Sequence, residues 1–175
     1  MYENMKTALE IEKKYIIKKP SIDDLRSYPE FTESEILQIY IQGGEGETHR
    51  VRRRIKGGVT VYTETIKRRV DKMSSTETEG EISKERFETL VETMLENTRP
   101  IVKRRYTFTY KSQMFEIDVY PEWEHTAILE TELSSRDKQV EMPEIIRILK
   151  DVTGDKRYSN AGMSREFPEE IVCYL

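Results

Sequence analysis

Charged residues of one sign recur at alternate positions in several short segments of this chain. The acidic pairs and triplets are Glu10/Glu12, Glu77/Glu79/Glu81, Glu116/Asp118 and Glu130/Glu132, and the basic ones are Arg50/Arg52/Arg54 and Lys103/Arg105. Alternate residues of a β-strand point to the same face, so each segment forms a row of like charges. Carboxylates are the ligands that hard divalent cations prefer, and Arg and Lys bind phosphate oxygens. Together these rows would suit a polyanion bound with divalent metal ions.

Two interpretations of these rows remain open from the residues alone. An antiparallel sheet often has one solvated face, and any single charged row fits that interpretation. The set as a whole fits a solvated face less well. Like charges on neighbouring positions repel, so a solvated face usually mixes signs within a strand, whereas here each strand carries charges of one sign. Apolar helices covering the other face would turn the charged face inward, around a polar lumen. Periodicity does not decide between the two.

A period of two dominates the chain and predicts about eight strands. The predicted strands are Leu9–Ile17, Glu35–Ile41, Thr48–Lys56, Val59–Arg68, Thr76–Ile82, Ile101–Lys111, Met114–Tyr120 and Ile128–Leu133. Gly57 and Gly58 stand between two of them and indicate a hairpin turn.

Two longer helices and one short helix are predicted between the strands. Lys84–Asn97 carries an apolar stripe at helical spacing and follows Ser83, a plausible N-cap. Pro143–Val152 begins with a residue suited to a first helical position and precedes Gly154, which suits a helix exit. Ser21–Ser27 is predicted as the short helix. The fold class is therefore α+β.

Composition narrows the possible functions. The 175 residues fit a single domain spanning 1–175, and the net charge of −4 argues against a nucleic-acid protein. No segment is apolar enough for a membrane span or an N-terminal signal peptide, and Cys173 has no partner for an intrachain disulfide. We therefore expect a cytoplasmic protein without a membrane partner. With His49 and His125 as the two histidines, a zinc cluster or a Cys–His nucleophile is not expected.

Glycine-rich phosphate-binding motifs are missing from the sequence. It contains neither G-x-G-x-x-G nor G-x-x-x-x-G-K-[ST], so Gly43, Gly44 and Gly46 are interpreted as turn residues. His49 falls on the apolar face next to Arg50 and is interpreted as a packed or surface histidine.

The charged motifs, taken in order, resemble those of the CYTH family, the triphosphate tunnel metalloenzymes. Glu10-Ile11-Glu12-Lys13-Lys14 is similar to the family's E-x-E-x-K strand. The later matches, in family order, are Arg50-Val51-Arg52, Thr65-Ile66-Lys67, Glu77/Glu79/Glu81, Lys103/Arg105-Tyr106, Glu116-Ile117-Asp118, Glu130-Thr131-Glu132 and Arg157-Tyr158-Ser159-Asn160. The resemblance runs from residue 10 to about residue 160.

The resemblance implies an eight-stranded antiparallel β-barrel or tunnel with a polar lumen, open at both ends, with helices packed on the outside. It also implies a triphosphate substrate and dependence on Mg²⁺ or Mn²⁺. The metal ligands expected first are Glu10, Glu12, Glu130 and Glu132, and those expected second, which could instead orient basic side chains, are Glu81, Glu116 and Asp118. The phosphate chain would be held by Lys14, Arg50, Arg52, Arg54, Lys67, Lys103, Arg105 and Arg157. Glu10, Glu12 and Lys14 are the expected catalytic group, with either a second metal ion or a glutamate such as Glu12 positioning the attacking water.

The expected activity is hydrolysis of inorganic tripolyphosphate with a neutral-to-alkaline optimum, because carboxylates must be ionised to bind metal. The alternatives are an adenylate cyclase or a thiamine triphosphatase of the same family, and a non-catalytic polyphosphate-binding module. A cyclase needs a purine pocket, to which Tyr120 or Trp123 could contribute a stacking ring. No nucleic-acid partner is expected, and dimers described in the family are the basis for expecting a homodimer.

Overall fold

A computed structural model describes residues 5–172, and Cys173 lies outside this range. The strands are β1 (Lys6–Lys18), β2 (Thr32–Ile41), β3 (Glu47–Lys56), β4 (Val59–Arg69), β5 (Ser74–Ile82), β6 (Ile101–Tyr110), β7 (Gln113–Val119), β8 (Thr126–Glu132) and β9 (Ile148–Asp151). The helices are α1 (Ile22–Leu25), α2 (Lys84–Val91), the 3-10 turn η1 (Lys156–Tyr158) and α3 (Asn160–Arg165).

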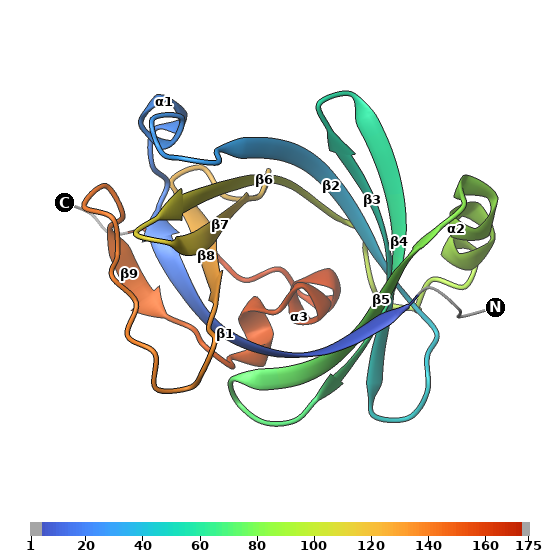
Figure 1. The fold of residues 1–175 in the computed structure, drawn as a ribbon. Helices are drawn as coiled ribbons and strands as arrows, with labels where there is room; N and C mark the ends of the chain where they lie inside the picture. The colour runs from blue at the N-terminus through green and yellow to red at the C-terminus, as the bar shows by residue number, and fades with distance from the viewer. Residues whose placement is uncertain (1–4, 173–175) are drawn as a thin grey trace.

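The strands form one closed antiparallel barrel, seen as a ring in Figure 1. Their order is β5-β4-β3-β2-β6-β7-β8-β1-β9, and β1 also pairs with β5 to close the ring. β1 achieves this because its 13 residues are shared: Lys6 to Ile11 pair with β5, and Glu12 to Lys18 pair with β8. The predicted α+β barrel is confirmed, with β9 as an additional strand.

The helix predicted at Pro143–Val152 is wrong, because the structure has strand β9 in this segment. Residues 148–151 are extended and pair with Tyr15, Ile16 and Ile17 of β1. Beyond Ile11, this edge of β1 no longer faces β5, and its backbone groups need partners. β9 supplies them, and the pairing outweighs the local helical signal of Pro143 and Gly154.

The helix predicted at Lys84–Asn97 is shorter than expected. Ser83 caps it through a bond from the Arg86 amide to its hydroxyl, as predicted, but α2 ends at Val91. The following residues bond instead to the end of β2, with the Leu95 amide donating to the Tyr40 carbonyl at 2.9 Å and the Gln42 amide to the Thr93 carbonyl at 3.1 Å. The short helix predicted at Ser21–Ser27 is confirmed as α1.

The apolar faces of the strands point outward, under the helices and loops. α2 packs on β2, β3 and β4 through Phe87, and Tyr62 lies beneath its ring at a centroid distance of 4.9 Å. A second outer cluster contains Tyr15, Tyr106, Phe108 and Phe115, against which α1 and the segment before β9 pack. Figure 1 shows α1 and α2 outside the ring. The charged faces are therefore left to point inward.

A third apolar cluster fills one end of the barrel interior. Ile16 and Ile128 are paired in register, and they pack with Tyr40, Ile101 and Met163 of α3. Tyr120, Trp123, Val152 and Tyr158 complete this cluster, which we call the floor. Figure 1 shows α3 inside the outline of the ring. The expected passage open at both ends is thus filled at this end, and α3 is a helix that the sequence patterns did not predict.

Candidate functional site

The strand register places the charged rows on the inner face of the barrel. Directly paired residues share a face, and the pairs Tyr40–Arg50, Arg50–Thr65 and Thr65–Glu79 form one row across four strands. Equivalent rows contain Gln38, Arg52, Thr63 and Glu81; Thr48, Lys67 and Glu77; and Lys14, Glu130 and Glu116. Ion pairs between strands that are not neighbours, such as Lys67 of β4 with Glu10 of β1 at 3.4 Å, confirm that these faces meet inside.

Two arginines of β3 form the centre of the basic side. Arg52 contacts Glu79 at 3.1 Å, and Arg50 lies 3.7 Å from both Glu77 and Glu79. The Nε of each arginine is buried and has no hydrogen-bond partner. Burial and the neighbouring Arg50 lower the pKa of Arg52, with Arg105 contributing further. These guanidinium groups therefore have unused donors in a region where positive charges crowd together.

Asp118 of β7 forms ion pairs with both Lys103 and Arg105 of β6. Asp118 is fully buried, accepts from Arg105 Nε at 2.6 Å and Nη2 at 2.7 Å, and accepts from Lys103 Nζ at 2.6 Å. Burial opposes ionisation of Asp118, but the two cations keep its pKa below the ordinary value. Arg105 also contacts Glu116 and Glu130, so it joins β6 to both following strands.

Lys14 of β1 is buried in the interior among carboxylates. Its ammonium group lies 2.8 Å from Glu130 and 3.8 Å from Glu12, and only 8% of the residue is exposed. Burial disfavours its charge, yet these carboxylates raise its pKa above the ordinary value. The same pairing holds the pKa of Glu130 well below its ordinary value despite burial. Lys14 therefore remains a cation, and Glu130 an anion, at any physiological pH.

Carboxylates crowd together on the other side of the interior. Burial and the neighbouring Glu77 raise the pKa of Glu10 to about 7, against the opposing effect of Lys67. Burial, Glu12 and Glu77 likewise raise the pKa of Glu132. Lys67 is the nearest cation, 2.8 Å from Glu77. This part of the interior has more negative charge than its own lysine neutralises.

These residues suit divalent cations chemically, because they offer several carboxylates that repel one another and are partly exposed to solvent. Glu10 and Glu12 retain 24% and 32% side-chain exposure, so ions can reach them. Within residues 5–172, no group of three or more possible ligands converges as a preformed metal site. Lys14 and Lys67 hold several of the carboxylates instead, so bound metal would have to replace these lysines as partners.

The remaining predicted site residues divide between the rim and the outer surface. Arg54 and Glu81 lie on inner-facing positions but are exposed at the rim. Arg157 has 72% side-chain exposure and binds Asp155 of its own turn, so the structure does not bring it to the interior. Its neighbours in the R-Y-S-N segment have structural contacts, since Tyr158 lies in the floor and Asn160 accepts from Lys103 at 3.4 Å.

Several interior residues were not among the predicted site residues. Glu77 and Glu79 were part of a recognised acidic row, and their proximity to Arg50 could have been expected from it. Gln38 and Tyr40 gave no signal, because they lie within the apolar segment Ile36–Ile41. His49 lies on the outer face, where Nε2 contacts the buried Glu64 at 2.9 Å, which agrees with its interpretation as a packed residue.

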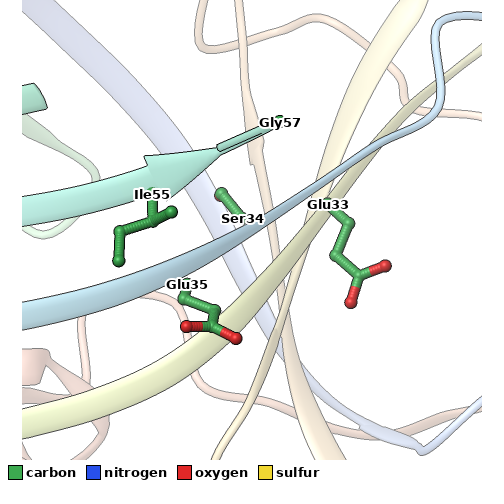
Figure 2. Close-up of a pocket in the computed structure, with 5 residues that line it drawn as sticks. All are labelled: Glu33, Ser34, Glu35, Ile55 and Gly57. Atoms are coloured by element: carbon green, nitrogen blue, oxygen red, sulfur yellow. The ribbon is translucent and has the colours of Figure 1, made fainter. Parts of the chain in front are cut away.

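A shallow depression at the β3–β4 turn is a poor alternative site. Figure 2 shows its lining, which consists of Glu33, Ser34, Glu35, Ile55 and Gly57. Its two carboxylates are paired with Arg104, and none of the lining residues is a lysine or arginine that could bind a phosphate chain. The described part of the chain also has no helix long and apolar enough to cross a membrane.

The fold is similar to that of several solved structures. The chain is 26% identical to the inorganic triphosphatase NE1496, covering 91% of this chain and 97% of that one with a TM-score of 0.58. A second structure of NE1496 gives 27% identity, coverage of 91% and 99%, and a TM-score of 0.55. The PH1819 protein from Pyrococcus horikoshii OT3 is 22% identical, with coverage of 73% and 80% and a TM-score of 0.57, and shows the fold alone. Neither a protein-family model nor a curated protein matches the chain.

Proposed function

From the premise that the fold is that of the CYTH, or triphosphate tunnel, family, we propose that this chain is a metal-dependent triphosphatase whose leading substrate is inorganic tripolyphosphate. The observation that carries the proposal is the unbalanced interior: Arg50 and Arg52 have buried, unpaired Nε donors, while Glu10 and Glu132 repel their acidic neighbours. A polyanion with bound divalent cations would relieve both.

The basic residues would bind and orient the phosphate chain. Arg50, Arg52 and Arg105 offer planar guanidinium groups suited to bidentate phosphate contacts, and Lys14 and Lys67 offer compact charges. Burial strengthens these contacts, because the effective dielectric inside the barrel is lower than in water. Holding three successive phosphates in one orientation is most of what phosphoryl transfer requires of a protein.

The carboxylates Glu10, Glu12 and Glu132 would hold Mg²⁺ or Mn²⁺. When bound, such ions neutralise phosphate oxygens and promote attack by water. Glu12 is the proposed water-positioning residue, since it lies beside Lys14 and remains partly exposed. Glu130 and Asp118 have the opposite character: both are buried, and Lys14 or Arg105 already neutralises them. We assign them to positioning these cations.

Two observations favour an inorganic substrate over a nucleotide. Tyr120 and Trp123, the aromatic residues considered for stacking on a purine, are 1% and 3% exposed within the floor. They are therefore packed against protein and offer no free ring face. The similar structure with the highest TM-score among those described above is an inorganic triphosphatase. A purely binding function would leave the repelling carboxylates unexplained.

The test is phosphate release from tripolyphosphate, ATP, thiamine triphosphate and pyrophosphate, with Mg²⁺ and then Mn²⁺. Wild type is compared with Glu10→Gln and Glu132→Gln, and Glu88→Gln on the exposed face of α2 is the matched control. We expect release from tripolyphosphate that both interior variants abolish and the control retains. Cyclic AMP from ATP without phosphate release would indicate a cyclase. Binding of tripolyphosphate without turnover of any substrate would indicate a binding module.

A further inference from the structure

One edge of β1 is incomplete where the strand carries its interior charges. On this edge, residues 6–11 pair with β5 and residues 15–17 pair with β9, so residues 12–14 lie in a gap between these two strands. The side chains of Glu12 and Lys14 extend from this gap into the barrel. The backbone groups in such a gap need partners other than a neighbouring strand, and the position of both side chains depends on those partners.

Two loops supply these partners. The Glu12 amide donates to the Met73 carbonyl at 3.0 Å, and the Val152 amide donates to the Lys14 carbonyl at 2.9 Å. The Lys14 amide donates to the hydroxyl oxygen of Thr153 at 3.0 Å, and this hydroxyl donates in turn to the Lys14 carbonyl at 3.3 Å. A hydroxyl can donate and accept at the same time, which a methyl group cannot. The side chain of Thr153 therefore binds Lys14 as the backbone of a neighbouring strand would.

The turn that carries Thr153 is itself fixed in place. The Thr153 amide donates to the Asp151 carboxylate at 2.8 Å. Gly154 follows with a φ of +73°, and a Cβ atom there would lie 2.4 Å from the Lys72 carbonyl oxygen. The Gly154 carbonyl accepts from Arg69 Nη2 at 3.0 Å. Because glycine permits both this conformation and this close approach, the turn packs against the β4–β5 loop and keeps the Thr153 hydroxyl at β1.

We propose that Thr153 is a positioning residue of the proposed active site. Its hydroxyl fixes the backbone of Lys14, and thereby the directions in which the Lys14 ammonium group and the Glu12 carboxylate enter the barrel. The inference rests on the proposed function and extends it to a residue on the loop after β9, which acts on the reaction only through β1.

This role predicts a difference between the effects on kcat and on KM. Most of the proposed phosphate contacts come from Arg50, Arg52 and Arg105, which lie on β3 and β6 rather than on β1. Glu12, the proposed water-positioning residue, lies within the gap. Misplacing a catalytic group by about 1 Å can reduce the rate about a hundredfold. We therefore expect loss of the Thr153 hydroxyl to lower kcat at least about tenfold and to leave KM within about threefold of wild type.

The experiment measures kcat and KM for tripolyphosphate in Mg²⁺, together with Tm, for wild type, Thr153→Val and Thr153→Ser. Valine keeps the shape of the side chain and removes the hydroxyl, whereas serine keeps the hydroxyl and should restore kcat. Thr98→Val is the matched control, because the Thr98 hydroxyl also donates to a backbone carbonyl, that of Leu95 at 2.6 Å, in the segment between α2 and β6. We expect Thr98→Val to lower Tm to a similar extent as Thr153→Val and to match wild type in kcat.

The outcomes separate the two proposals. A wild-type protein that does not hydrolyse tripolyphosphate refutes the proposed function and this inference with it. An active wild type with Thr153→Val within about twofold of its kcat refutes the inference alone, as does an equal loss of kcat in Thr153→Ser. If Thr153→Val melts below the assay temperature, Asp151→Ala replaces it, because Asp151 is exposed and its removal releases the Thr153 amide while keeping the hydroxyl. That variant should lower kcat by a smaller factor without raising KM, whereas an unchanged kcat would contradict the positioning role.

Discussion

Replacing Asp118 by Asn should destabilise the protein more than any comparable substitution of an exposed acid. Asp118 is fully buried and is the shared partner of Arg105 and Lys103, both themselves almost completely enclosed. The amide has nearly the same shape but no charge. It would leave two buried cations with weaker compensation, and loss of one partner of a buried ion pair typically costs about 3 to 5 kcal/mol.

The assay is chemical and thermal unfolding in the absence of metal and phosphate. For a chain of this size, each kcal/mol shifts Tm by about 2 to 4 °C, so we expect a decrease on the order of 10 °C. Asp155→Asn is the control, because its partner Arg157 is exposed and such pairs contribute little. We expect it to change Tm by less than about 2 °C.

A double variant tests whether uncompensated positive charge causes the loss of stability in Asp118→Asn. Lys103→Met removes one of the uncompensated cations, so Asp118→Asn with Lys103→Met should be more stable than Asp118→Asn alone. A single variant within about 1 kcal/mol of wild type would show that Asp118 does not neutralise these cations. A double variant less stable than the single one would show that the destabilisation has another source, and the positioning role of Asp118 would have to be abandoned.

Three further predictions concern other parts of the barrel. The pKa of Glu10 is raised from 4.5 to about 7, so ionising Glu10 lowers the stability of the folded protein as pH rises through this window. Relative to metal-free wild type, Glu10→Gln should therefore become progressively more stable between these pH values. A Tm difference between the two proteins that is the same at both ends of the window would contradict this. Arg52→Met should weaken tripolyphosphate binding at least about tenfold without lowering the Tm of the ligand-free protein, because Arg52 is crowded by other cations; calorimetry and a thermal melt measure the two effects. Glu64→Gln, outside the barrel, should lower the free energy of unfolding by about 1 to 3 kcal/mol without changing KM, since Glu64 is buried and accepts from His49 and Arg86; a changed KM would argue that the outer face affects the site.

The sequence was most informative where a strand alternates strictly. Glu10, Glu12 and Lys14 are predicted on one face and lie on one face, because the period of two is a property of the extended backbone. Whether that face points inward depends on what covers the other. Phe87 of α2 and Tyr28, whose ring lies 5.0 Å from that of Phe108 of β6, supply that cover, and they act between segments distant in the sequence. The local sequence pattern therefore predicted the charged rows, whereas tertiary packing determined whether they face the barrel interior or solvent.

The errors arose where backbone pairing overrides local preference. Residues 148–151 follow a proline and precede a glycine, as a helix would, yet they complete the edge of β1. α3 is six residues long and has no apolar stripe of the usual length, so periodicity could not predict it. Its position is determined by Met163 in the floor and by Asn160, which accepts from Lys103 and from Tyr120 at 2.9 Å. Tyr40 gave no signal of an interior position, since its segment of β2 contains no charged residue between Ile36 and Ile41.

The ligand-free interior is held together by ion pairs that a substrate complex would have to exchange. Arg50 cannot turn fully to a phosphate while it neutralises Glu77, and Glu77 cannot lose Arg50 without adding to the repulsion around Glu10. Metal bound to the carboxylates would release Arg50, and phosphate bound to the arginine would release carboxylates for metal. Binding of either ligand thus lowers the free-energy cost of binding the other, and thermodynamic linkage makes this effect reciprocal. The mixed signs of the barrel interior therefore fit a protein that binds an anion and its metal ions as one unit.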